Sequence, residues 1–273
     1  MYSSHFTEFS YGYALTDNIL HAALPSKQAA PIFPSLIAEG SAGGGYDVQI
    51  PSAPVPLFLQ FKIPQVVRRR SDNMPAGFVN PYLRMHLRTK RPNQHQLLLE
   101  LEAQGNVVTY ATPNFWTTGD LDAHFLDQRV HLETCYFSPS DIGPMNNDPH
   151  YVAYCPGMSD AWVFSKLKPF TGKFTPEAFG ERISAAAENA QEQEPLHFFK
   201  KLKRILVEIT GEELLPQAEA RFSQGIDSSV VRAAREVTYL AQVRFDSTFA
   251  VAGRKSGRQP RPDSPSKTRQ VRR

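Results

Sequence analysis

The chain has 273 residues, of which 41% are hydrophobic and 21% are charged, a composition typical of a soluble globular protein. No apolar run approaches the roughly 20 residues that span a membrane. The N-terminus lacks the basic region and apolar core of a secretory signal, so we expect a cytoplasmic protein with no membrane partner. Its two cysteines, Cys135 and Cys155, suit neither a disulfide framework nor a zinc site, and we expect both to be buried.

The positive charge is concentrated at the C-terminus. Residues 254–273 hold eight basic residues and one acidic residue, while the formal net charge of the whole chain is +3. The remainder is therefore net acidic, and any affinity for nucleic acid must come from local patches and this tail. Because residues 254–273 are rich in Pro, Ser and Arg, we expect them to be disordered.

The first half of the chain alternates predicted helices and strands. Apolar spacing favours a helix over 6–22, and Gly105 is expected to end a second helix. An order of helix, three strands, helix and strand predicts an α/β layered domain, which we place at 1–165. The strands of this order are 31–37, 46–50, 57–62 and 107–111, the second helix is 94–101, and 82–87 is a further candidate strand.

The pattern becomes helical after about residue 170. Thr175 is a good N-cap for a helix that has Pro176 at its first position. Further helices are predicted over 196–209 and 227–243. We therefore expect a helical subdomain at 170–250. Between the two regions, a short helix is predicted at 121–125 and strands at 130–137 and 151–154.

Three polar side chains meet at the ends of two predicted strands. Asp47 begins one strand, and Gln60 and Lys62 end the next, so an antiparallel hairpin would bring them together. Gln60 and Lys62 are two residues apart and share one face of the sheet, whereas Phe61 points into the core. Mg²⁺ prefers oxygen ligands such as the Asp47 carboxylate, the Gln60 amide oxygen and the Phe61 carbonyl. A neighbouring Lys can orient or deprotonate water and offset charge in a phosphodiester transition state.

These residues carry a family resemblance. Gly44-Gly45-Tyr46-Asp47 followed by Leu57-Phe58-Leu59-Gln60-Phe61-Lys62 resembles the PD-(D/E)xK nuclease superfamily, in particular the Mrr-type restriction endonuclease variant with a D…QxK motif. The restriction-endonuclease-like αβββαβ core of that family has the order predicted for residues 6–112.

The resemblance implies a role for each residue of the motif. Asp47 and Gln60 would bind Mg²⁺ or Mn²⁺, and Lys62 would activate water. In this family a Glu on the first helix often joins the site, so Glu8 is a candidate, with Glu39 as its rival.

The function implied by the resemblance is a Mg²⁺-dependent endonuclease in bacterial restriction or anti-phage defence. It would act on DNA rather than RNA. Residues 170–250 would then serve target recognition, homodimerisation or docking to a partner protein. An alternative is a catalytically inactive nuclease-like fold that binds nucleic acid or acts as an assembly subunit. A third is an unrelated α/β scaffold with a chance motif.

Several of these residues have simpler interpretations. Asp47 could close the glycine turn before it, and Lys62 could be a solvent-exposed lysine at a strand end. Glu8 and Glu39 could be surface residues. The basic run Arg68-Arg69-Arg70 suits phosphate contacts, or a solvated loop. The cluster Lys200-Lys201-Lys203-Arg204 suits a solvated helix face, or contact with a DNA backbone.

Overall fold

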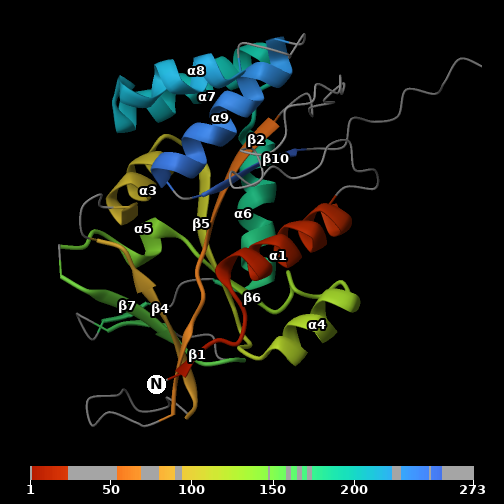
Figure 1. The fold of residues 1–273 in the computed structure, drawn as a ribbon, viewed down its shortest axis with the longest axis vertical. Coiled ribbons are helices and arrows are strands. Elements are labelled where there is room, and N and C mark those ends of the chain that lie inside the picture. The colour runs from red at the N-terminus through yellow and green to blue at the C-terminus, as the bar shows by residue number, and fades with distance from the viewer. Residues whose placement is uncertain are drawn as a thin grey trace, which may run out of the picture.

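The computed structural model describes residues 2–23, 54–68, 80–89, 94–146, 148–157, 161–164, 168–170, 174–222, 229–245 and 247–253. The fold combines helices with two sheets, so the predicted mixed α/β class is confirmed (Figure 1). The helices are α1 (Glu8–Ala23), α3 (Gln94–Ala103), α4 (Thr118–Leu126), α5 (Pro139–Ile142), α6 (Pro176–Asn189), α7 (Pro195–Thr210), α8 (Leu215–Phe222) and α9 (Ser229–Phe245), with a 3-10 turn at Glu212–Leu214.

Within the described residues, the strands form a six-stranded and a four-stranded sheet. The larger sheet has the order β1-β3-β4-β7-β8-β9, and all of its neighbouring pairs are antiparallel. Its strands are β1 (Tyr2–Ser3), β3 (Gln65–Val67), β4 (Tyr82–Leu87), β7 (His150–Tyr154), β8 (Ala161–Val163) and β9 (Lys168–Phe170). The smaller sheet has the order β10-β2-β5-β6, with strands β2 (Pro54–Phe61), β5 (Val107–Pro113), β6 (Thr134–Phe137) and β10 (Thr248–Gly253).

Strand β2 lies inside the smaller sheet and has a partner on each edge. It runs parallel to β5, with Gln60 opposite Tyr110, and antiparallel to β10, with Leu59 opposite Thr248. A hairpin partner at 46–50 was predicted for this strand, but β10 takes that edge between Pro54 and Leu59. Residues 31–37 and 46–50 lie outside the described residues.

The two faces of β2 contact different parts of the core. Leu57, Leu59 and Phe61 join the apolar cluster that contains Tyr11 and Leu15 of α1. Helix α1 approaches closely because Gly12 has no side chain: an added Cβ would lie 2.6 Å from Cδ2 of Phe61.

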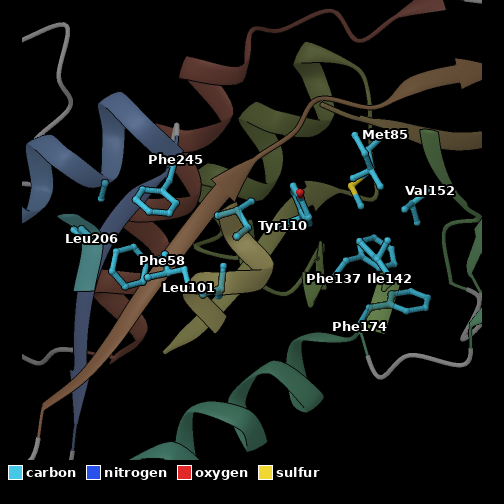
Figure 2. Close-up of a cluster of buried hydrophobic side chains, with 14 of the residues drawn as sticks. Phe58, Met85, Leu101, Tyr110, Phe137, Ile142, Val152, Phe174, Leu206 and Phe245 are labelled. Atoms are coloured by element: carbon cyan, nitrogen blue, oxygen red, sulfur yellow. The ribbon is translucent and has the colours of Figure 1, made fainter. Parts of the chain in front are cut away.

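The opposite face of β2 carries Phe58 into the larger core cluster. Figure 2 shows Phe58 beside Leu101, Leu206 and Phe245, which come from α3, α7 and α9. The C-terminal helices therefore share one core with the sheet. The predicted helical segment 170–250 contains α6 to α9, and Thr175 caps α6 as expected, but its last residues belong to β10. The tail 254–273 lies outside the described residues.

The larger sheet packs one face against the same core. Met85 of β4 and Val152 of β7 lie near Phe137, Ile142 and Phe174 (Figure 2). The chain passes from the smaller sheet to the larger one through residues 62–64, between β2 and β3. Lys62 therefore lies at the junction of the two sheets.

Cys135 and Cys155 are both buried free thiols, as expected. Among the described residues, no helix has the length and apolarity needed to cross a membrane.

Candidate functional site

Gln60 and Lys62 lie at the carboxyl end of β2, where it runs beside the parallel strand β5. Both side chains are buried: Gln60 is 0% exposed and Lys62 is 8% exposed. The interpretation of Lys62 as a solvent-exposed lysine is therefore wrong. Burial of an amide and an ammonium is costly unless each has hydrogen-bond partners.

Gln94, the first residue of α3, supplies those partners. Its Nε2 donates to Gln60 Oε1 at 2.7 Å, and its Oε1 accepts from Lys62 Nζ at 3.2 Å. The second hydrogen of Nε2 is used as well, because Nε2 donates to the carbonyl oxygen of Phe245 at 2.8 Å. Gln94 thus fixes the separation of Gln60 and Lys62 and connects them to the end of α9.

Two further polar groups lie near Gln60 among the described residues. Its Nε2 donates to the Phe61 carbonyl oxygen at 3.1 Å. Ser247 Oγ lies 3.4 Å from Gln60 Oε1 and 3.1 Å from the Phe245 carbonyl oxygen, and a hydroxyl can donate to only one of them at a time. The shorter distance favours the carbonyl, so Gln94 is the principal donor to Gln60.

Sequence reasoning missed Gln94 and Ser247. Gln94 is a polar residue in the first turn of a helix, which gives no periodic signal. Ser247 reaches Gln60 only because β10 pairs with β2, a contact between segments 187 residues apart.

The predicted acidic residues are not all visible at this site. Asp47 and Glu39 lie outside the described residues. Glu8 begins α1, the helix that packs on the ring of Phe61. Because Phe61 and Gln60 point to opposite faces of β2, α1 and Gln94 lie on opposite sides of the sheet. The structure brings Gln60 and Lys62 together and does not show Glu8 joining them.

The basic run after the motif is only partly described. Arg68 is exposed and follows β3, whereas Arg69 and Arg70 lie outside the described residues. Arg68 lies six residues beyond Lys62, just after β3, and its contact with nucleic acid stays a prediction.

Two neutral oxygens lie at the end of β2. Gln60 Oε1 and the Phe61 carbonyl are neutral oxygens of the kind that Mg²⁺ accepts. No group of three or more His, Cys, Asp or Glu side chains suited to a metal occurs in the described part of the chain. A metal held there would also need a carboxylate, a role that the sequence motif assigns to Asp47 with Glu8 or Glu39. The neutral oxygens fit the metal, but they do not hold it alone.

Positive charge gathers beside Lys62. The pKa of His86, an exposed residue of β4, is lowered first by partial burial and then by the charges of Lys62, Arg88 and Arg84. All the charged groups that shift this pKa are cations. These groups are basic, although the chain before residue 254 is net acidic.

No family model, curated protein or solved structure matches the chain. The function has to be inferred from the motif and the geometry of Gln60, Lys62 and Gln94.

The basic cluster on α7 lies elsewhere. A cavity of about 530 Å³ between α7, α8 and α9 is lined by Lys200, Lys203, Arg232 and Glu236, among others. Lys203 Nζ pairs with Glu219 at 2.8 Å and with Glu236 at 2.9 Å. Part of the cluster therefore holds the C-terminal helices together.

His95 is a structural residue next to the site. Its Nε2 lies 2.8 Å from the carbonyl oxygen of Gly143, which can only accept, so Nε2 carries the proton. Nδ1 is then the acceptor for the Tyr110 hydroxyl at 2.9 Å. Burial lowers the pKa of His95, the Gly143 carbonyl opposes this shift, and the charge of His150 adds to it.

We expect stability to fall as the pH falls below about 6.5, the ordinary pKa of histidine. The pKa of His95 is lower in the folded state than in the unfolded state, so the unfolded chain takes up the proton first. This contribution is fully present above the unfolded pKa and is lost as the pH falls through it. Urea unfolding at several pH values measures this effect. The free energy of unfolding of His95→Gln should depend less steeply on pH than that of the wild type. Part of the pH dependence should remain in this variant, because burial also lowers the pKa values of His86 and His131. An unchanged slope would exclude His95 as a contributor.

Proposed function

We propose that this chain is a metal-dependent nuclease that hydrolyses phosphodiester bonds in DNA, with Gln60 and Lys62 in its active site. The observation that carries the proposal is the pair itself. Gln94 hydrogen-bonds to both Gln60 and Lys62, two buried side chains at the end of β2. A buried ammonium is costly to keep, and such groups occur preferentially where chemistry needs them.

Each residue has a defined task in this proposal. Lys62 Nζ would orient the attacking water and offset negative charge that develops on the phosphate. Gln60 Oε1 and the Phe61 carbonyl would supply neutral oxygens to Mg²⁺ or Mn²⁺, and Asp47 a carboxylate, with Glu8 or Glu39 as a further acid. Bound Mg²⁺ supplies Lewis-acid activation of the phosphate and of water. Gln94 is a positioning residue, because it contacts Gln60 and Lys62 rather than the phosphate.

The topology after the motif matches the PD-(D/E)xK core only in part. In that core the motif strand is followed by a helix and then a further strand. Here β3 and β4 come between β2 and α3, and β5, which follows α3, is parallel to β2. An Mrr-like role in bacterial restriction or anti-phage defence rests on the resemblance of the motif. Helices α6 to α9 would then contribute target recognition, dimerisation or docking to a partner protein.

A second candidate function rests on one specific contact. Gln60 Oε1 already accepts a hydrogen bond of 2.7 Å from Gln94, which occupies one of its two lone pairs. A neutral ligand engaged in this way suits a nuclease-like fold that binds nucleic acid without cutting it. Metal binding separates the two candidates.

The test uses purified full-length protein with supercoiled plasmid and with circular single-stranded DNA. Cleavage should occur with Mg²⁺ or Mn²⁺ and not with EDTA, and Asp47→Ala should abolish it. Calorimetric titration with Mn²⁺ should show binding that Asp47→Ala removes. If DNA is bound but Mn²⁺ is not, and neither substrate is cut, the second candidate replaces the first. Cleavage that is unaffected by Asp47→Ala would contradict the proposed site.

A further inference from the structure

The chain passes from α9 into β10 beside the candidate site. Phe245 ends α9, and Thr248 begins β10 opposite Leu59 of β2. Phe245 and Ser247 are both 0% exposed. The backbone N–H of Ser247 donates to the carbonyl oxygen of Ala241 at 3.3 Å, which ties this part of the chain to α9 as well as to the sheet. We call the Phe245 carbonyl and the Ser247 hydroxyl the α9–β10 corner.

The α9–β10 corner closes a ring of four polar groups. Gln94 Nε2 donates to Gln60 Oε1 at 2.7 Å and to the Phe245 carbonyl oxygen at 2.8 Å. Ser247 Oγ lies within hydrogen-bond distance of the same two oxygens, 3.4 Å from the first and 3.1 Å from the second. Ser247 therefore contacts both of the oxygens that hold the NH₂ group of Gln94.

The corner also determines which way the Gln94 amide faces. A carbonyl oxygen can only accept a hydrogen bond, so the Phe245 carbonyl requires the NH₂ group of Gln94 on its side. The amide oxygen of Gln94 then faces Lys62, whose ammonium can only donate. A reversed amide would place its oxygen against two acceptors and its NH₂ group against a buried cation, which is costly. The orientation that suits the corner is therefore the one that accepts from Lys62.

We propose that the Ser247 hydroxyl and the Phe245 carbonyl are positioning groups of the active site, which set the separation of Gln60 and Lys62 through the Gln94 amide. The part that Lys62 plays in cleavage rests on the proposed nuclease function, but its contact with Gln94 can be followed without cleavage. In this arrangement the end of α9 and the start of β10 belong to the catalytic unit. Truncation before α9 would remove part of the active site and not only a recognition surface.

Ser247→Ala tests the corner with the smallest change. Loss of one neutral hydrogen bond should lower the single-turnover rate of DNA cleavage roughly 2- to 10-fold. Gln94→Met removes the whole amide and should lower that rate about 10- to 100-fold. Affinity for an oligonucleotide in EDTA should stay unchanged in both variants, because neither group contacts DNA. If Ser247 acts through Gln94, the double variant should be no slower than Gln94→Met alone.

Gln94→Glu provides a measurement that does not depend on cleavage. The oxygen of Gln94 that this variant would make part of a carboxylate lies 3.2 Å from Lys62 Nζ. A negative charge there stabilises the ammonium, so the midpoint of the Lys62 titration should rise by about one to three pH units. NMR of protein labelled with ¹³C at lysine Cε follows the titration, and Lys62→Met assigns the resonance. Ser247→Ala should also shift this resonance.

The matched controls remove the same groups elsewhere. Ser138 is a buried serine that donates to Glu102, eight residues along α3 from Gln94. Gln96 is an exposed glutamine of the same helix. Ser138→Ala and Gln96→Met should leave both the cleavage rate and the Lys62 resonance unchanged. A thermal melt should show that each variant is folded.

The outcomes separate the corner from the nuclease function. A Lys62 resonance that is unchanged in Ser247→Ala, or a Lys62 titration that is unchanged in Gln94→Glu, would overturn the proposal whether or not the protein cuts DNA. Rate losses that multiply in the double variant would overturn it as well, because Ser247 would then act independently of Gln94. If Lys62 responds as expected and the wild type cuts no DNA, the nuclease function alone is contradicted.

Discussion

Lys62→Met should lower the rate of DNA cleavage by at least about 100-fold, because a positioned group that handles a proton contributes roughly 100- to 10,000-fold. Met has a similar length but has no charge and no donor for water or phosphate. The hydrogen bond from Lys62 Nζ to Gln94 Oε1 is lost, but so is the cost of a buried ammonium. The measurement is the single-turnover rate of cleavage at saturating Mg²⁺.

The matched control for this variant is Arg129→Met. Arg129 is exposed and lies outside α6 to α9, and its replacement also removes one positive charge without touching the site. Its cleavage rate should equal that of the wild type. A thermal melt should show that Lys62→Met is folded. A folded Lys62→Met protein that cuts DNA at the wild-type rate would exclude Lys62 from the chemistry.

Phe58→Ala should lower the free energy of unfolding by about 3–5 kcal/mol, the range for removal of a buried aromatic ring. Phe58 is 0% exposed, and its ring lies 5.2 Å from that of Phe249 in β10. It also lies beside Leu206 and Phe245 (Figure 2), so the cavity would adjoin a strand and two helices. A loss of this size is a large part of the stability of a typical domain. Urea denaturation followed by circular dichroism measures it.

Phe9→Ala is the corresponding surface control. Phe9 is 51% exposed on α1, and the same truncation there should change stability by no more than about 0.5 kcal/mol. If the two variants lose similar stability, burial of Phe58 in the core shared by the sheet and the C-terminal helices does not explain the loss. A fall in the denaturant slope for Phe58→Ala would indicate instead that the helices unfold separately.

Local patterns were enough to predict much of the secondary structure. The predicted strand 82–87 has the same bounds as β4, and the helix predicted at 196–209 differs from α7 by one residue at each end. Both segments have a clear apolar period. Thr175 and Pro176 also marked the start of α6, because capping depends on residues within one turn.

Long-range pairing could not be predicted in the same way. Residues 248–253 form a strand because β2 offers them an edge, and nothing in their own sequence indicates that partner. The division into two sheets depends on the turn of the chain after Lys62, which local propensity does not determine. Gln60 and Lys62 were predicted as a pair from their spacing of two, whereas Gln94 was found only through the packing of α3.

The central claim is that the Gln60–Lys62 pair belongs to a nuclease active site, and plasmid cleavage by the wild-type protein tests it most directly. Supercoiled plasmid incubated with Mg²⁺ should be converted to nicked or linear DNA, and EDTA should prevent the conversion. Lys62→Met protein that is purified in the same way should leave the plasmid supercoiled. No conversion of plasmid or single-stranded circles by the wild type with Mg²⁺ or Mn²⁺, or equal conversion by Lys62→Met, would contradict the claim.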